Sequence, residues 1–172
     1  HDYYGKVEQP VLTLKTPDGR VISTINNYYG LNITFRFNDV SEVEFSLPAF
    51  YDGEPNSCYA EVYGMRLVEV EPFGDFILVN PQTTNDGGRK EIKTCKAYSL
   101  EFGFNYKKAE IPAGTYNFYN PVDNEDTIIQ MIVEFMPDWS IGEIDRELIG
   151  RWRTFDTVDD NLYSFMMNTI QE

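Results

Sequence analysis

Apolar and polar residues alternate along most of the first two thirds of the chain, with the period of two that places every second side chain on one face of a β-strand. Two such runs flank the sequence TPDG within residues 10–25, and this segment predicts a β-hairpin. The next two runs are expected to bury one sheet face each, formed by Leu31, Ile33, Phe35 and Phe37 and by Val43, Phe45 and Leu47.

More strands are expected further along. Residues 58–70 form a long apolar run with a bend or bulge expected at Gly64, and Phe76–Val79 reads as a short strand. Asp86–Gly88 favours a tight reversal into a strand over residues 91–104. Short strands joined by short turns predict an antiparallel β-barrel or β-sandwich.

Helical spacing replaces the alternation after Asn120. We expect two short amphipathic helices, the first with Asp123 or Asn124 as its N-cap and Pro137 after its end, and the second beginning near Thr157. Their predicted buried faces consist of Ile128, Ile129, Ile132 and Phe135 or Met136 in the first helix and of Leu162, Phe165, Met166 and Ile170 in the second.

Charge changes at the same place as the pattern. The last 52 residues hold 12 acidic and 3 basic residues, whereas the first 120 hold 16 and 11. We therefore expect a β-barrel-like domain over residues 1–120 and the start of a second, helix-containing domain over residues 121–172. The expected fold class is α+β, mainly β.

Both tryptophans lie in the segment DWSIGEIDRELIGRWRTF, residues 138–155, between the two expected helices. Alternation of Trp139 with Ile141 predicts a short strand, Asp145 can cap the turn RELI, Gly150 can end it, and RWRTF reads as a strand. We interpret this segment as a structural joint rather than a binding site, formed by Trp139, Ile141, Gly142, Leu148, Arg153 and Phe155.

Net charge and rare residues limit the possible functions. The formal charge of −14 opposes binding to phosphate backbones, and no apolar run approaches the length of a membrane span. His1 is the single histidine, so a catalytic triad, a Cys-His pair and a histidine zinc site have no good candidate. Cys58 and Cys95 are expected to be buried thiols, and a disulfide between them is possible only if their strands are neighbours.

Other candidate sites are weaker. Asp123, Glu125 and Asp126 are interpreted as helix-capping residues rather than a calcium site, because the mid-loop glycine and distal glutamate of a calcium loop are missing. No phosphate-binding glycine motif is present, so we expect no cofactor, no metal and no catalytic residue. A group of aromatic residues in loop-like stretches fits either packing or sugar stacking: Tyr28, Tyr29, Phe50, Tyr51, Tyr116, Phe118 and Tyr119.

Several segments together resemble a known family. They are RFNDVSEVEFSLP, DFILVNPQTTNDGGRKEIKTCKAYSLEFGF, IIQMIVEFMPDWSIGEIDRELIGRWRTFD and LYSFMMNTIQE, and the most specific words are W-x-I-G at Trp139–Gly142 and R-T-F at Arg153–Phe155. The chain resembles the N-terminal region of phage and prophage tail-tip (baseplate hub) proteins, which include tail-associated lysins and prophage endopeptidase tail proteins, often described as minor structural proteins.

This resemblance implies a homotrimer that closes the tail tube, contacts distal tail and tube proteins, and lets DNA pass as cargo. It places the protein in the virion tail, assembled in the bacterial host cytoplasm, with any lysin or peptidase activity in C-terminal domains outside these 172 residues. We accordingly expect a piece of a longer protein that is not itself an enzyme. The main alternative is a non-catalytic β-sandwich carbohydrate-binding module, followed by a hydrolase with two carboxylates in a cleft.

Overall fold

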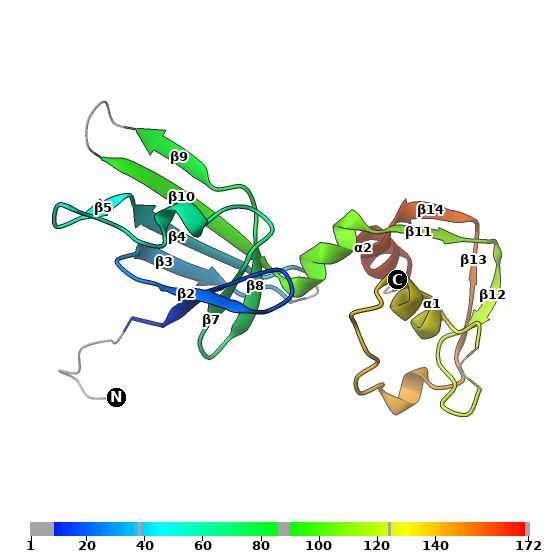
Figure 1. The fold of residues 1–172 in the computed structure, drawn as a ribbon. Helices are drawn as coiled ribbons and strands as arrows, with labels where there is room; N and C mark the ends of the chain where they lie inside the picture. Colours follow the sequence, from blue (N-terminus) through cyan, green and yellow to red (C-terminus); the bar gives the residue numbers. More distant parts are fainter. Residues whose placement is uncertain (1–8, 38, 86–89, 124, 171–172) are drawn as a thin grey trace. The chain divides into compact units, whose positions relative to one another are not determined.

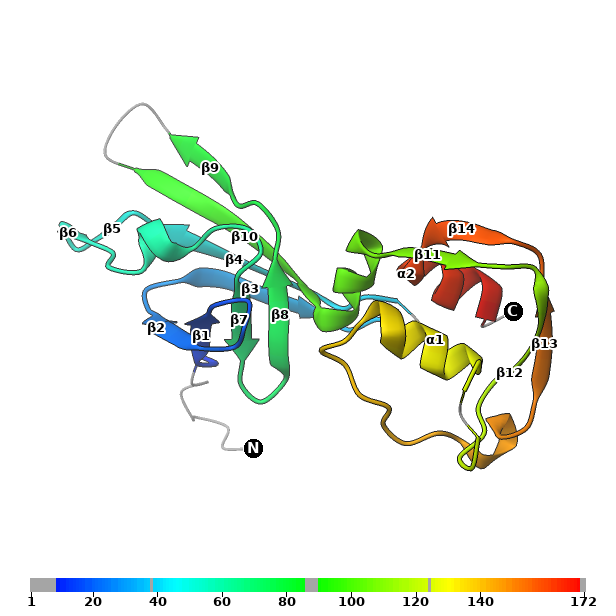
Figure 2. The ribbon, with the colours of Figure 1, turned by 45° about the vertical axis from the view of Figure 1, so that its right-hand side comes forward.

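The computed structural model describes residues 9–37, 39–85, 90–123 and 125–170. The chain divides into two compact units, one ending at Phe102 and the other beginning at Gly103 (Figures 1 and 2). The structure is mainly β, with one large antiparallel sheet in the first unit and short helices concentrated in the second.

The first unit is an eight-stranded sheet in which every described pairing is antiparallel. Its strand order is β2-β1-β7-β8-β10-β4-β3, and β9 also pairs with β10. The strands are β1 (Leu12–Lys15), β2 (Val21–Ile25), β3 (Tyr29–Thr34), β4 (Glu42–Pro48), β7 (Leu67–Val70), β8 (Gly74–Leu78), β9 (Gln82–Asn85) and β10 (Glu91–Ser99).

The two strands at the ends of this order, β2 and β3, follow each other in the chain and are joined only by residues 26–28. A linker this short holds the end of β2 close to the start of β3. The sheet must therefore curl so that its two edges approach each other at this end, although the described residues contain no ladder between β2 and β3.

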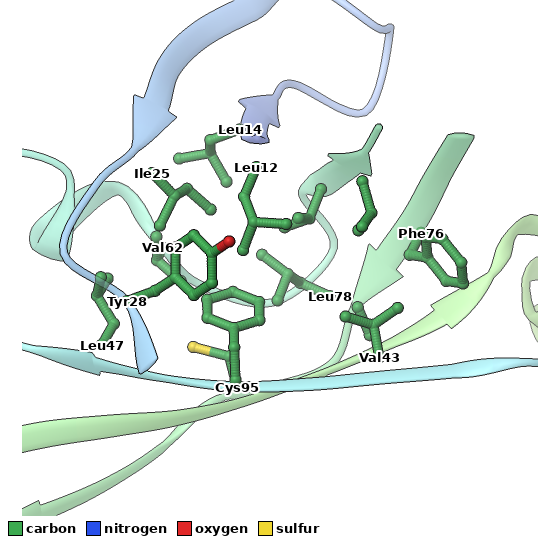
Figure 3. Packing of buried hydrophobic residues seen from close by; sticks show 14 of the residues in the cluster. Leu12, Leu14, Ile25, Tyr28, Val43, Leu47, Val62, Phe76, Leu78 and Cys95 are labelled. Atoms are coloured by element: carbon green, nitrogen blue, oxygen red, sulfur yellow. The ribbon is translucent and has the colours of Figure 1, made fainter. Parts of the chain in front are cut away.

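The core of the first unit lies inside this curl (Figure 3). β4 shows why: its side chains alternate between buried and half-buried positions, and Val43, Phe45 and Leu47 are the buried ones. Tyr28, in the linker between the sheet edges, packs edge-on against Phe45 with ring centroids 6.2 Å apart, and its hydroxyl donates to the carbonyl of Pro10. The linker is therefore anchored in the core.

Several expectations for this unit are confirmed. The segment 10–25 forms the β1–β2 hairpin, β4 covers the expected alternating run, and β8 covers most of the short strand expected at residues 76–79. Cys58 and Cys95 are free, buried thiols in one hydrophobic cluster. The expected turn at residues 86–88 lies outside the described residues.

Three expectations for this unit are wrong. β3 ends at Thr34, so Phe35 and Phe37 leave the sheet and are 60% and 93% exposed. The run expected as one strand over residues 58–70 begins instead with a 3-10 turn, η1 (Tyr59–Glu61), and only β7 is strand. β10 ends at Ser99 rather than near residue 104, and the chain continues as a second 3-10 helix, η2 (Leu100–Tyr106).

A short hairpin leaves the main sheet after β4. It is formed by β5 (Phe50–Tyr51) and β6 (Glu54–Pro55), whose residues are exposed. Asp52 and Gly53 form its tip, and both have positive φ angles, 49° and 85°, as tight reversals require.

The second unit is built on a bent antiparallel ribbon. β11 (Lys108–Ile111) pairs with β14 (Val158–Asn161), and β12 (Gly114–Asn117) pairs with β13 (Trp152–Phe155). Each strand of the ribbon is interrupted once, at residues 112–113 and 156–157. α1 (Ile128–Phe135), α2 (Leu162–Ser164) and a following π-helical turn, η4 (Phe165–Ile170), complete this unit together with η3 (Arg146–Leu148).

Side chains from the ribbon and the helices share one core. Ala109, Ile111 and Phe155 from the ribbon are buried together with Ile128 of α1 and Leu162 of α2. The other buried members are Phe104, Met136 and Phe165. The residues that pack against them with part of their surface exposed are Tyr116, Phe118, Met131, Ile132, Phe135, Val158, Tyr163 and Met166.

The expected start of each helix is corrected by its actual cap. Thr127, not Asp123, caps α1: its Oγ1 accepts from the amide nitrogen of Gln130 at 3.3 Å, whereas the other candidate, Asn124, lies outside the described residues. The sequence TVDD enters β14 instead of a helix, and Asn161 caps α2 by accepting from the amide nitrogen of Ser164 at 2.8 Å. Both errors arise because several adjacent polar residues can all serve as caps.

The buried faces expected for the helices are found in part. Ile128, Leu162 and Phe165 are buried and Met136 nearly so, and α1 ends before Pro137 as expected. The expected side-chain position of Ile170 lies outside the described side chains.

The division between units falls after Phe102, not near Asn120. The strands β11 and β12, which precede Asn120, pair with β14 and β13 from the end of the chain and therefore belong to the second unit.

Candidate functional site

The segment between α1 and β13 contains the residues interpreted as a structural joint. Trp139 is 38% exposed and its ring lies 4.8 Å from that of Phe104, so it covers one side of the second core. Phe155 is buried between Tyr116 and Phe165, with ring centroids at 6.3 Å and 5.5 Å. Trp139 and Phe155 therefore take structural positions.

The middle of the segment differs from the expected strand. Trp139 and Ile141 lie in an irregular stretch, and the backbone at Gly142 has space for a side chain and no positive φ angle. Asp145 does cap the turn η3, where its Oδ1 accepts from the amide nitrogen of Glu147 at 3.0 Å, and Gly150 follows with a φ angle of 73°. The bend thus requires Gly150 and not Gly142.

Leu148 and Arg153 meet at a small cavity of about 240 Å³, which we call the basic cavity; its lining residues are Phe118, Leu148, Arg151, Trp152 and Arg153. Backbone hydrogen bonds fix its walls: Phe118 donates to the carbonyl of Arg151 at 2.6 Å, and Gly150 donates to that of Tyr119 at 3.0 Å. A cavity this small fits one side chain or a small anion rather than a drug-sized ligand.

The two guanidinium groups at the basic cavity are weakly engaged. Arg151 pairs with Glu147 at 3.7 Å, and both side chains are largely exposed, so this pair contributes under about 1 kcal/mol. The side chain of Arg153 is half-buried and has no hydrogen bond or ion pair with any residue that the structure describes. The cavity can therefore offer hydrogen-bond donors and positive charge to an anionic group.

A second cavity of about 410 Å³, which we call the acidic cavity, lies beside the same tryptophan. Asp123, Glu125 and Asp126 line it together with Thr115, Tyr116, Asn117, Asn120, Thr127 and Trp152. The three carboxylates are exposed rather than capping α1. Within the described ranges no group of three or more His, Cys, Asp or Glu side chains is arranged to hold a metal ion.

Trp152 separates the two cavities and is 64% exposed. Neither Trp152 nor Phe118 was among the residues expected in the joint. The alternation along β13 does carry a signal for Arg153, because a strand places it on the same face as the buried Phe155 and opposite to Trp152. No local signal places Phe118 or the acidic residues there, since their position depends on the pairing of β12 with β13.

The two thiols do not form an activated nucleophile. Burial raises the pKa of Cys95 to about 12 and also raises the pKa of Cys58, so both remain protonated near neutral pH. Cys58 donates through Sγ to Oδ1 of Asn56 at 3.2 Å. Their arrangement fits packing rather than chemistry.

The aromatic residues in loop-like stretches separate into two kinds. Tyr28 is buried and Tyr116 and Phe118 pack against the second core, whereas Tyr29, Phe50 and Tyr51 are each about half exposed. Another exposed pair was not expected: Phe35 contacts Phe73 with ring centroids 5.1 Å apart.

In the part of the chain that the structure describes, no helix is both long enough and apolar enough to cross a membrane. Comparison of the chain with protein-family models, curated proteins and solved structures finds no match.

Proposed function

We propose that this chain is a structural component of a phage or prophage tail tip, in which copies form a homotrimeric ring that closes the tail tube. The sequence resemblance supports this proposal, with W-x-I-G and R-T-F as its most specific words. In this account the protein acts in the virion tail, is assembled in the bacterial host cytoplasm, and contacts distal tail and tube proteins.

The observation that carries the proposal furthest is the curled antiparallel sheet of the first unit. The edge strands β2 and β3 are joined by only residues 26–28, and the core lies within the curl. The resemblance to tail-tip hubs implies a barrel-like domain, and the curl of the sheet supports the description of the first unit as barrel-like.

The positions of residues in and near the W-x-I-G and R-T-F motifs also support an architectural role. Trp139 and Phe155 contribute to the second core, and Leu148 ends the turn that leads into β13. We propose that these residues serve packing and that the chain itself is not an enzyme. Any lysin activity would belong to C-terminal domains outside it.

The excess of acidic residues in the chain fits this proposal. If part of the charge of −14 lines the lumen of the ring, DNA passes without sticking, because binding to DNA depends on positive side chains that release its counterions. A basic lumen in a structure of the assembled ring would exclude this part of the proposal.

The experiment that tests the proposal is light scattering of the purified chain at increasing concentration, followed by negative-stain electron microscopy. We expect a species with three times the mass of one chain and ring-shaped particles with threefold symmetry. Particles without a central opening, or closed assemblies with a different number of copies, would contradict it.

The exposed aromatic residues of the first unit favour a second candidate, a non-catalytic carbohydrate-binding module. Phe50 and Tyr51 on the β5–β6 hairpin and the Phe35–Phe73 pair offer aromatic faces on which sugars can stack. A glycan array distinguishes the two candidates: specific sugar binding that is lost in a Phe50→Ala, Tyr51→Ala variant supports the module, and the absence of binding supports the structural role.

A further inference from the structure

The surface around Trp152 carries opposite charges on its two sides. Arg151 and Arg153 line the basic cavity, and Asp123, Glu125 and Asp126 line the acidic cavity. Trp152 borders both and exposes 64% of its surface. Exposed tryptophan and arginine are the residue types most often found at the energetic centre of protein interfaces.

Charged side chains at each cavity also lack partners of opposite charge within the described chain. The guanidinium of Arg153 has no ion-pair or hydrogen-bond partner among the described residues, so its donors are available. At the acidic cavity, Asp123, Glu125 and Asp126 are exposed and form no ion pair with any described residue. Their negative charges are therefore available to positive side chains of another molecule.

We infer that a second copy of this chain docks at this surface, with the guanidinium groups of one copy facing the acidic cavity of the next and Trp152 at the centre of the contact. The inference rests on the proposed function in taking another copy as the partner, and charge complementarity between the two cavities supports that choice. It assigns the contact between copies to the ends of β12 and β13.

The proposed ring also determines the symmetry of this contact. In a closed trimer each copy contacts two neighbours, so its basic cavity faces one neighbour and its acidic cavity faces the other. Such a head-to-tail contact is heterologous, and repetition closes it into a ring or extends it into a filament.

Charge reversal tests the inference directly. Sedimentation velocity of the whole chain over a range of concentrations is measured for the wild type, Arg153→Glu, Glu125→Lys and the double variant carrying both changes. Glu125 is preferred to Asp126 because the backbone of Asp126 has a positive φ angle of 56°, which a larger side chain strains. Arg20→Glu is the matched control: it reverses an exposed arginine in the β1–β2 turn of the first unit.

We expect each single reversal to weaken the association constant by about tenfold or more, since it replaces an attractive charge contact by a repulsive one. The double variant restores association because the reversed charges face each other again, and an equimolar mixture of the two single variants does the same. Arg20→Glu leaves association at the wild-type level. Far-ultraviolet circular dichroism of each variant confirms that it is folded.

Three results would overturn the inference: a wild-type chain that remains monomeric throughout, single reversals that associate like the wild type, or a double variant as weak as the single ones. The second result, together with threefold rings, leaves the proposed hub intact and moves the contact to another surface. Conversely, charge-dependent association into open chains supports this surface and contradicts the closed ring.

Discussion

Replacing Phe155 by alanine is expected to destabilise the second unit strongly. Phe155 is 6% exposed and touches Tyr116 and Phe165 from the inner face of β13. Truncation of a buried phenylalanine to alanine costs about 3 to 5 kcal/mol, which includes the loss of its aromatic contacts. A unit of about 70 residues has a free energy of unfolding of about 4 to 10 kcal/mol. The substitution therefore removes between about a third of that stability and all of it.

Tryptophan fluorescence is a suitable assay because both tryptophans, Trp139 and Trp152, lie in the second unit. With a dependence on urea of about 1 kcal/mol/M, the loss moves the unfolding midpoint down by roughly 3 to 5 M, or leaves the unit unfolded without urea. Val122→Ala is the matched control, since Val122 is 94% exposed and its truncation is expected to change the midpoint little.

The reasoning is refuted if Phe155→Ala unfolds at the wild-type urea concentration. That result would mean that Phe155 is not part of a cooperative core, and the interpretation of the segment as a structural joint would fail with it. Phe155→Leu provides a graded test, because leucine retains much of the buried volume and is expected to fall between alanine and the wild type.

Three further predictions concern single positions. Burial raises the pKa of Cys95 from 9.0 to about 12, so between those pH values only the unfolded state loses the thiol proton. This thiol therefore leaves the free energy of unfolding unaffected below pH 9 and lowers it as pH rises toward 12. Urea titrations at several pH values should show a shallower fall in stability for Cys95→Ala than for the wild type. Gly64→Ala should destabilise the first unit by about 1 to 3 kcal/mol, because the added Cβ would lie 2.2 Å from Oδ1 of Asn80. Thermal unfolding should show that a Gly64→Ala, Asn80→Ala double variant regains most of the lost stability, and no regain would refute this contact. Asn161→Ala removes the cap from the amide nitrogen of Ser164 and should lower the stability of the second unit by about 1 kcal/mol in tryptophan-monitored urea titrations, whereas an unchanged midpoint would show that the cap is not needed.

The part of the fold that could be predicted from the sequence rests on local signals. The hairpin of β1 and β2 follows from alternation around TPDG, and the buried positions of β4 follow from its period of two. Asp145 and Gly150 were predicted as the ends of one turn for the same reason, since capping and positive φ angles depend on neighbouring residues.

The remainder depends on contacts between distant residues. The division after Phe102 could not be predicted, because β11 and β12 belong to the second unit only through pairing with strands about 35 to 53 residues later. Phe35 continues the alternation of β3 beyond the point where the strand ends. The two cavities beside Trp152 arise in the same way, since the pairing of β12 with β13 brings their residues together.

Immunogold electron microscopy tests the central claim most directly. Antibodies raised against the purified chain are applied to intact tail particles induced from the bacterium that encodes it. The account predicts gold label at the distal end of the tail, abolished by prior incubation of the antibody with the purified chain. Label on the capsid or along the tail shaft, or intact tails that carry none although the chain is detected in the cell extract, would contradict it.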